Sequence, residues 1–173
     1  MDPAVLRHFE PHIRKLGEVA GGRLDELARK VERNPPKLEH RDRFGRDVDD
    51  IEYHPAYREM EKIGFEDFEM HAMCHKSGSF GWEGPAPLAA KYAFQYLFSQ
   101  SEFGMMCPLS ITDASIQVLA KFGSDELKAE LLPRMTSTNL DTLWKGTQWM
   151  TERAGGSDVG QLETEARQEK GVW

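Results

Sequence analysis

Apolar side chains at the start of the chain recur every three or four residues, which is the period of an amphipathic helix. The pattern predicts one helix over residues 3–16 and a second over 24–31, with a break at the Gly21-Gly22 pair. Asn34-Pro35-Pro36 should end the second helix, because proline lacks an amide hydrogen and restricts the residue before it. Residues 37–53 are polar with few apolar anchors, so we expect an irregular connection there.

The helical period continues through the middle of the chain. Residues 55–74 fit two short helices broken near Gly64, and a loop rich in glycine, serine and proline follows. Longer helices are predicted from Pro87-Leu88 onward, from 109 to 122, and from 124 to 135. The last of these begins with a serine, a good N-cap, followed by two carboxylates that favour the positive end of the helix dipole. The sequence therefore predicts a mainly α domain.

After Thr138 the period changes from helical to alternating, and we place a domain boundary between residues 1–140 and 141–173. Residues 147–151 alternate aromatic or branched side chains, which favours a strand, and residues 154–157 (AGGS) then form a tight turn. Because glycine lacks a Cβ, such a turn can offer amide groups and a hydroxyl to a phosphate or a planar heterocycle. A plain surface hairpin is the alternative. Residues 169–173 indicate a second hairpin turn that enters a strand.

Composition narrows the class of protein. The chain has 173 residues, of which 39% are hydrophobic and 29% charged, which is typical of a folded globular protein. Its net charge of -7 argues against attraction of the whole chain to nucleic acid or to an anionic membrane. No apolar run approaches the roughly 20 residues that span a bilayer, and no secretory signal is visible, so we expect a cytoplasmic protein. Cys74 and Cys107 do not form a disulfide framework, and burial as small apolar side chains is expected for both.

Other candidate chemistry is weak. His71, Cys74 and His75 have a spacing that can hold zinc, but no fourth ligand is evident, so we expect ordinary packing or a surface position and no metal site. His8 and His12 repeat the spacing and receive the same interpretation. A basic cluster lies among acidic neighbours, which favours a solvated loop or an intersubunit salt-bridge surface over a nucleic-acid site. Its members are Lys37, His40, Arg41, Arg43 and Arg46.

Residues 148–158, QWMTERAGGSD, resemble the flavin-binding signature of the acyl-CoA dehydrogenase superfamily. Two upstream stretches, 107–114 (CPLSITDA) and 42–55 (DRFGRDVDDIEYHP), are similar to its AidB-like branch. Arg153 stands where the superfamily often has proline, and a basic residue is common there in this branch. The resemblance covers most of the chain. It implies an acyl-CoA dehydrogenase-like N-terminal helical domain followed by the first strands of a middle β-domain, and thus the amino-terminal part of a longer protein.

The resemblance also assigns a site for FAD. It implies that backbone groups of three residues line the isoalloxazine ring, that a threonine hydroxyl bonds the pyrimidine edge, and that a Gly-Ser pair meets the pyrophosphate or the CoA side. The serine would also bind substrate. These residues are Gln148, Trp149, Met150, Thr151, Gly156 and Ser157. The catalytic base, a glutamate in this superfamily, is expected from a later helical domain, so residues 1–173 should be inactive alone.

The activity implied by the resemblance is the FAD-dependent α,β-dehydrogenation of an acyl-CoA thioester in fatty acid metabolism. An electron acceptor such as an electron-transfer flavoprotein and a homotetramer are implied with it. Aromatic side chains of residues 92–103 are expected to pack between helices, and one of them could border the acyl pocket. Two alternatives stay open. One is an AidB-like flavoprotein that protects DNA from alkylation through regions beyond this chain, and the other is a non-catalytic helical interaction domain.

Overall fold

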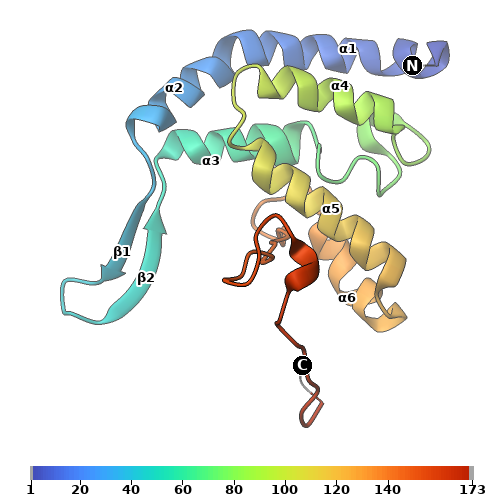
Figure 1. Ribbon diagram of the computed structural model, residues 1–173. Coiled ribbons are helices and arrows are strands. Elements are labelled where there is room, and N and C mark those ends of the chain that lie inside the picture. Colours follow the sequence, from blue (N-terminus) through green and yellow to red (C-terminus); the bar gives the residue numbers. More distant parts are fainter. Residues whose placement is uncertain (1, 172–173) are drawn as a thin grey trace.

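The computed structural model describes residues 2–171, and its longest feature is a helical run formed by α1 (Pro3–Val19) and α2 (Asp25–Arg33) (Figure 1). A π-helical turn, η1 (Ala20–Leu24), joins them, so the break predicted at Gly21-Gly22 is wrong. Neither glycine has a positive φ, and one face of the run is buried on both sides of the pair. Tertiary packing thus outweighs the low helix propensity of glycine. The buried face includes Phe9, Leu16, Leu24 and Leu27.

The segment after α2 is a β-hairpin that projects away from the helices (Figure 1). Strands β1 (Lys37–Arg41) and β2 (Asp47–Glu52) pair antiparallel, so the irregular connection predicted for 37–53 is wrong. The Asp42 carboxylate accepts the amides of Phe44 and Arg46, and Gly45 has φ +78. This is ordinary hairpin-turn chemistry and was the available signal in the sequence. Every residue of both strands is exposed, so the strands have no alternation of buried and exposed side chains that the sequence pattern could have revealed.

Helix α3 (Pro55–Glu61) continues directly into a second π-helical turn, η2 (Lys62–Asp67). The predicted break near Gly64 therefore lies later, at Glu69, which has φ +46, and residues 70–75 form turns rather than a second helix. Gly64 is buried against α5, and a Cβ there would lie 2.9 Å from Leu109 Cδ1. The glycine thus permits close packing instead of ending a helix.

The remaining helices follow the predictions closely. They are α4 (Leu88–Ser99), α5 (Met106–Phe122) and α6 (Asp125–Met135), with a 3-10 turn, η3 (Ser79–Gly81), in the loop before α4. The Ser124 hydroxyl caps α6 by accepting the amide of Leu127 at 3.3 Å, as the sequence predicted. Figure 1 shows α4 beside α1, and α5 crossing toward α6. The mainly α fold is confirmed.

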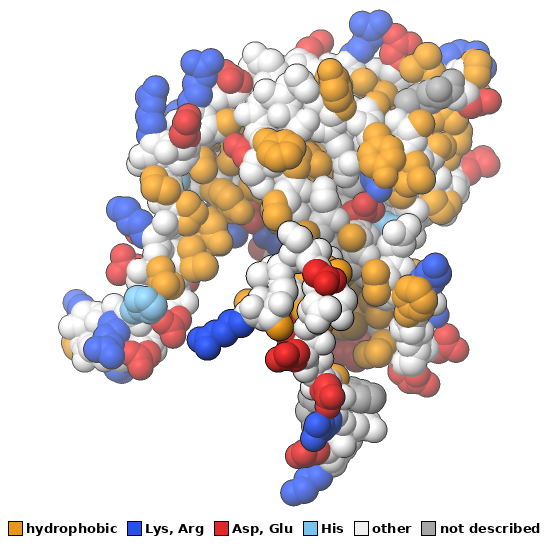
Figure 2. Space-filling model, in the orientation of Figure 1, with side chains coloured by type: hydrophobic (Ala, Val, Ile, Leu, Met, Phe, Trp, Pro, Cys, Tyr) orange, Lys and Arg blue, Asp and Glu red, His pale blue; other side chains and the backbone are white. Residues whose placement is uncertain are grey.

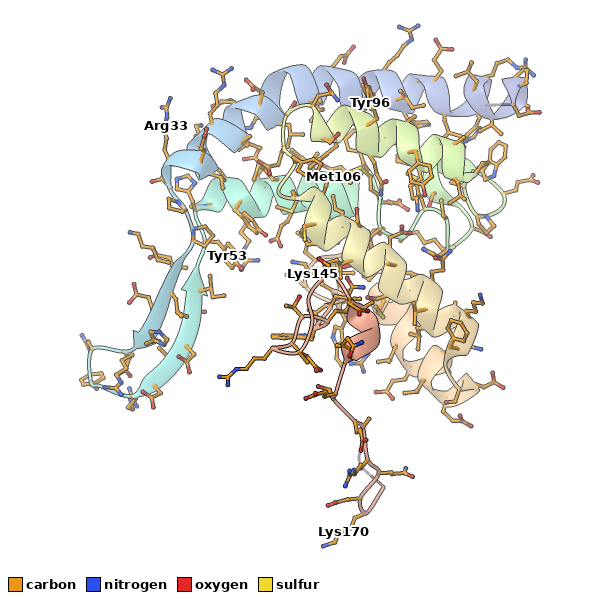
Figure 3. All side chains as sticks on the ribbon, in the orientation of Figure 1. Arg33, Tyr53, Tyr96, Met106, Lys145 and Lys170 are labelled. Atoms are coloured by element: carbon orange, nitrogen blue, oxygen red, sulfur yellow. The ribbon has the colours of Figure 1, made fainter. Side chains whose placement is uncertain are left out.

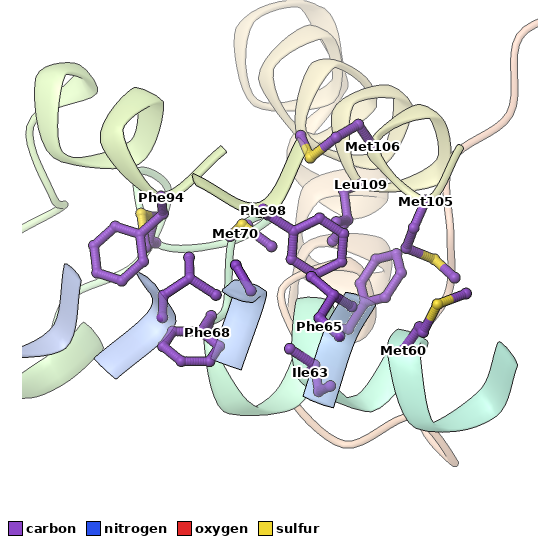
Figure 4. Packing of buried hydrophobic residues seen from close by; sticks show 14 of the residues in the cluster. Met60, Ile63, Phe65, Phe68, Met70, Phe94, Phe98, Met105, Met106 and Leu109 are labelled. Carbon is purple, nitrogen blue, oxygen red and sulfur yellow. The ribbon is translucent and has the colours of Figure 1, made fainter. Parts of the chain in front are cut away.

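Aromatic rings form the centre of the core. Phe94 stacks on Phe80 with ring centroids 5.2 Å apart, and its edge meets Phe9 at 6.3 Å. Figure 4 shows Phe94, Phe98 and Phe65 with several methionines between α3, α4 and α5. This core joins α3 and α5, the two helices whose side chains hold the chain at Lys145 and Gly146.

Residues 141–171 have little regular structure. The strand predicted at 147–151 is not formed, because it pairs with no other strand among residues 2–171. A 3-10 turn, η4 (Val159–Gln161), follows, and Lys170 and Gly171 have the positive φ values of a hairpin turn. The strand expected at 172–173 lies outside the described residues. Within residues 2–171, no helix combines the length and the apolar character needed to cross a bilayer.

Candidate functional site

The segment that follows α6 is tied to the helical body at separate polar points. The Leu140 amide donates to Glu66 Oε1 at 2.8 Å, and Lys145 forms an ion pair with the Glu61 carboxylate. The Gly146 amide donates to Thr112 Oγ1 at 3.1 Å. These contacts reach both α3–η2 and α5. They hold the chain just before the flavin-signature residues.

Gly146 lies so close to α5 that no side chain fits there. An added Cβ would stand 2.2 Å from Ser115 Oγ, 2.6 Å from Ser115 Cβ and 3.1 Å from the Ile111 carbonyl oxygen. Rotation of the serine could move only the hydroxyl. The glycine therefore sets how closely the segment approaches the helix.

Substituting Gly146→Ala is expected to lower the free energy of unfolding by about 1–3 kcal/mol, because the methyl group overpacks this contact. Chemical denaturation of the two proteins measures the difference. Gly21→Ala is the matched control, since nothing lies within 4 Å of its added Cβ. That change should leave stability equal or raise it by up to about 1 kcal/mol. Equal stability of Gly146→Ala and the unaltered chain would contradict the close packing.

Beyond Gly146 the signature residues lie at the surface. Trp149 is 90% exposed, and the Thr151 and Ser157 side chains are also exposed. The backbone of residues 147–151 makes no hydrogen bond to any part of the chain between residues 2 and 171. Gly156 is exposed and lies beside Thr151, with 3.8 Å between an added Cβ and Thr151 Cγ2. The predicted site residues thus form one open edge with unused backbone donors and acceptors.

Glu152 closes this edge into a turn. Its amide donates to the Gly155 carbonyl at 3.1 Å, and its carboxylate accepts the amides of Glu163 and Thr164 and the Thr164 hydroxyl. The hydrogen bond from the Thr164 side chain, followed by that from the Glu163 amide, holds the pKa of Glu152 below its ordinary value. The acidic residue of the signature therefore organises the loop and does not point to a ligand.

Two apolar hollows lie along α5 next to this edge. The first, of about 510 Å³, lies between α5 and α6 and is bordered by Thr147 and Gln148. The second, of about 680 Å³, lies between α4 and α5, and Ile111 lines both. Figure 2 shows hydrophobic side chains exposed over the region of α4 and α5. The two hollows meet at Ile111 and are together called the apolar strip; its end between α5 and α6 borders the predicted flavin edge.

Most of this strip was not predicted from the sequence. Of the aromatic side chains expected to pack between helices, Phe94 and Phe98 are buried, whereas Tyr92, Tyr96 and Phe103 are exposed and line the larger hollow. Cys107 lines it as well and is exposed, so its predicted burial is wrong, while Cys74 is half-buried. Both thiols are free. The available signal was the row of small residues on α5, whose short side chains leave space at the surface.

The histidines flanking Cys74 serve separate partners. His71 is buried and its Nε2 lies 3.0 Å from the Ser137 carbonyl, whereas His75 Nε2 lies 2.7 Å from Asp113 Oδ1. Burial pulls the pKa of Asp113 upward, but hydrogen bonds from His75 and Lys91 outweigh it and leave the pKa lowered. Among residues 2–171 no group of three metal-ligating side chains converges.

The basic cluster lies on the projecting hairpin, where acidic side chains pair with part of it. Arg41 pairs with Asp47 at 2.9 Å, and Arg46 pairs with Asp42 at 2.8 Å. His40 Nδ1 lies 2.8 Å from Asp49 Oδ1, and Arg43 lies over the Phe44 ring. The expected offset of the basic charges is therefore present for Arg41 and Arg46.

Similarity to known proteins identifies the family of this chain. The family model described as the adaptive response protein AidB N-terminal domain matches residues 4–142. The chain belongs to the AidB N-terminal domain family. This confirms its place in the AidB-like branch of the acyl-CoA dehydrogenase superfamily, as the signature at 148–158 and the upstream stretches indicated.

Similar proteins are much longer than this AidB-like chain. Acyl-CoA dehydrogenase family member 11 of Caenorhabditis elegans is 30% identical over 164 residues, which cover 89% of this chain and 25% of that protein. The solved apo form of Bd2924 is 31% identical, with a TM-score of 0.79, over 92% of this chain and 31% of that one. ACDH-11 of Caenorhabditis elegans, solved in complex with C11-CoA, shares the fold with a TM-score of 0.78 at 24% identity, over 92% of this chain and 27% of that chain.

Proposed function

We propose that this chain forms the helical side of an FAD-dependent acyl-CoA dehydrogenase-type oxidoreductase that carries out α,β-dehydrogenation of an acyl thioester. The observation that carries the proposal is the apolar strip along α5, which begins where Thr147 and Gln148 border it. A planar ring held at residues 148–151 would thus stand at the mouth of a space suited to an acyl chain. Bound FAD would supply the two-electron acceptor for this reaction.

The donor set of the exposed edge fits a flavin. Unpaired backbone groups over residues 147–151 can meet the polar rim of the ring, and the exposed Thr151 hydroxyl can bond its pyrimidine edge. Gly156 leaves room for a phosphate, and Ser157 adds a hydroxyl for the pyrophosphate or for CoA. The matched family region ends at residue 142. This supports the proposed boundary between a helical domain, residues 1–140, and a following segment that contains the flavin edge.

The proposal extends to the whole protein by analogy with the family. It includes a base from a later helical domain, an acceptor such as an electron-transfer flavoprotein, a homotetramer and a place in fatty acid metabolism in the cytoplasm. An AidB-like role in DNA protection would have to rest on other regions, because Arg41 and Arg46 of the hairpin are paired with carboxylates and the chain has a net charge of -7. The hollow beside the flavin edge favours the dehydrogenase over a purely structural helical domain.

The protein with its middle and carboxy-terminal domains is expected to bind FAD, and an acyl-CoA should bleach the flavin absorbance under anaerobic conditions. Thr151→Val should weaken FAD binding roughly fivefold to tenfold by removing one hydrogen bond. Thr138→Val is the matched control, because Thr138 lies in the connection after α6, away from the exposed edge, and no hydrogen bond of its hydroxyl is present within residues 2–171. Residues 1–173 alone should bind FAD only weakly, since they offer one edge. Tight stoichiometric binding by that chain, or a flavin that no acyl-CoA reduces, would overturn the proposal.

A further inference from the structure

We infer that Glu61 is a positioning residue for the flavin edge: its buried carboxylate fixes the point at which residues 147–158 leave the helical body. The inference rests on the proposed function, because those residues matter only if they hold the cofactor. The structural part of the inference is the contact between Glu61 and Lys145, called the clamp below, and it can be tested without any ligand.

Glu61 has an unusual environment for a carboxylate at the end of a helix. Its side chain is 3% exposed, yet it pairs with two cations. Arg58 Nη1 lies 2.7 Å away and comes from the same helix, whereas Lys145 is 84 positions distant in the sequence. A buried carboxylate is strongly destabilising when it loses a partner, so the arrangement resists displacement of Lys145.

Contacts with α3 and with α5 hold the chain from two sides. Lys145 is held by α3 through Glu61 and lies over the Phe65 ring, with 5.3 Å between Nζ and the ring centroid. The next residue, Gly146, donates its amide to Thr112 on α5 and packs against that helix without room for a Cβ. Thr112 is itself buried and donates its hydroxyl to the Pro108 carbonyl at 2.7 Å. Figure 3 labels Lys145 where the segment passes these helices.

No comparable polar contact with the helical body exists farther along the described chain. From residue 147 to residue 171, every hydrogen bond and ion pair stays within that segment. The position of the flavin edge over α5 is therefore set by Lys145 and Gly146. These residues lie only a few positions before the edge, and each residue of extended chain spans about 3.3 Å. Since binding sites need groups placed within about 0.5 Å, loosening this point should disturb the edge.

The first experiment measures hydrogen exchange of the 173-residue chain. Glu61→Gln and Lys145→Met should each speed exchange of the Gly146 amide and its neighbours roughly tenfold or more, because the ion pair is lost. Lys145→Arg should restore protection to within about twofold, since it keeps the charge. Lys62→Met is the matched control. Lys62 follows Glu61 in the chain, but its side chain is exposed and forms no ion pair with any of residues 2–171, so exchange near Gly146 should stay within about threefold.

The second experiment measures FAD affinity of the protein with its further domains. Glu61→Gln and Lys145→Met should each weaken it roughly tenfold, and the double variant should be no weaker than either, because both remove one interaction. Lys145→Arg and Lys62→Met should bind within about threefold of the unaltered protein, because both leave the charge pairs of Glu61 in place. If Glu61→Gln does not fold, the comparison of Lys145→Met with Lys145→Arg decides alone.

The outcomes separate the two proposals. Unchanged exchange and unchanged FAD affinity in Glu61→Gln or Lys145→Met would overturn the positioning role while the flavin site stands. Faster exchange with unchanged FAD affinity would also overturn it, since the clamp would then not govern the edge. Failure of the unaltered protein to bind FAD would overturn the proposed function, whatever the exchange results.

Discussion

Replacing Phe94 with alanine is expected to lower the free energy of unfolding by about 3–5 kcal/mol, the largest effect of any single substitution that we predict. Phe94 is fully buried in α4 and its ring contacts the rings of Phe9, Phe68 and Phe80. Truncation would leave a cavity among groups that come from four parts of the chain. Equilibrium denaturation with urea, followed by tryptophan fluorescence and circular dichroism, measures the loss.

Tyr96→Ala is the matched control for this substitution, because it lies on the same helix and is 68% exposed. Its removal should change stability by no more than about 0.5 kcal/mol. Phe94→Leu should fall between the two, since a smaller cavity remains. A Phe94→Ala protein as stable as Tyr96→Ala would mean that the aromatic cluster does not hold the helices together.

Lowering the pH should destabilise the fold through His71. Burial of the imidazole, which outweighs the hydrogen bond to the Ser137 carbonyl, lowers the pKa of His71 from 6.5 to about 4. The unfolded chain therefore binds a proton in a range where the folded chain does not. Stability is complete above about pH 6.5 and falls progressively toward pH 4, with a loss of about 3 kcal/mol from this group.

The measurement is the free energy of unfolding between pH 7 and pH 4, for the unaltered chain and for His71→Gln. Glutamine can still donate a hydrogen bond but does not titrate, so the variant should show a flatter dependence on pH. His71→Gln is expected to be less stable at pH 7 and to approach the unaltered chain near pH 4. Parallel curves for the two proteins would exclude His71 as the source of the acid sensitivity.

The helices were predictable because their signals are local. Ser124 caps α6 through the hydrogen bond that the sequence suggested, and the apolar period of α4 and α5 reports which face is buried. The glycines were harder to interpret. Gly21 and Gly64 both lie inside continuous helical runs, because contacts from distant residues offset their weak helix propensity.

The candidate site was only partly predictable. Its signature residues lie along one exposed edge, but the strand assigned to 147–151 lacks a partner within residues 2–171. A strand needs hydrogen bonds from a neighbour, and alternation of side chains cannot supply them. The apolar strip beside the edge combines exposed aromatic residues of α4 with small residues of α5, and neither stretch shows in isolation that a hollow lies between them.

The sequence by itself determined the helical class, the N-cap of α6 and the flavin-like signature, since each depends on residues that are neighbours in the chain. Only the tertiary structure decided that Glu61 and Lys145 meet, that Gly146 must be a glycine, and that the signature stands at the mouth of an apolar hollow. Those features join residues far apart in the sequence. Their energies come from burial and charge pairing, which exist only once the helices have packed.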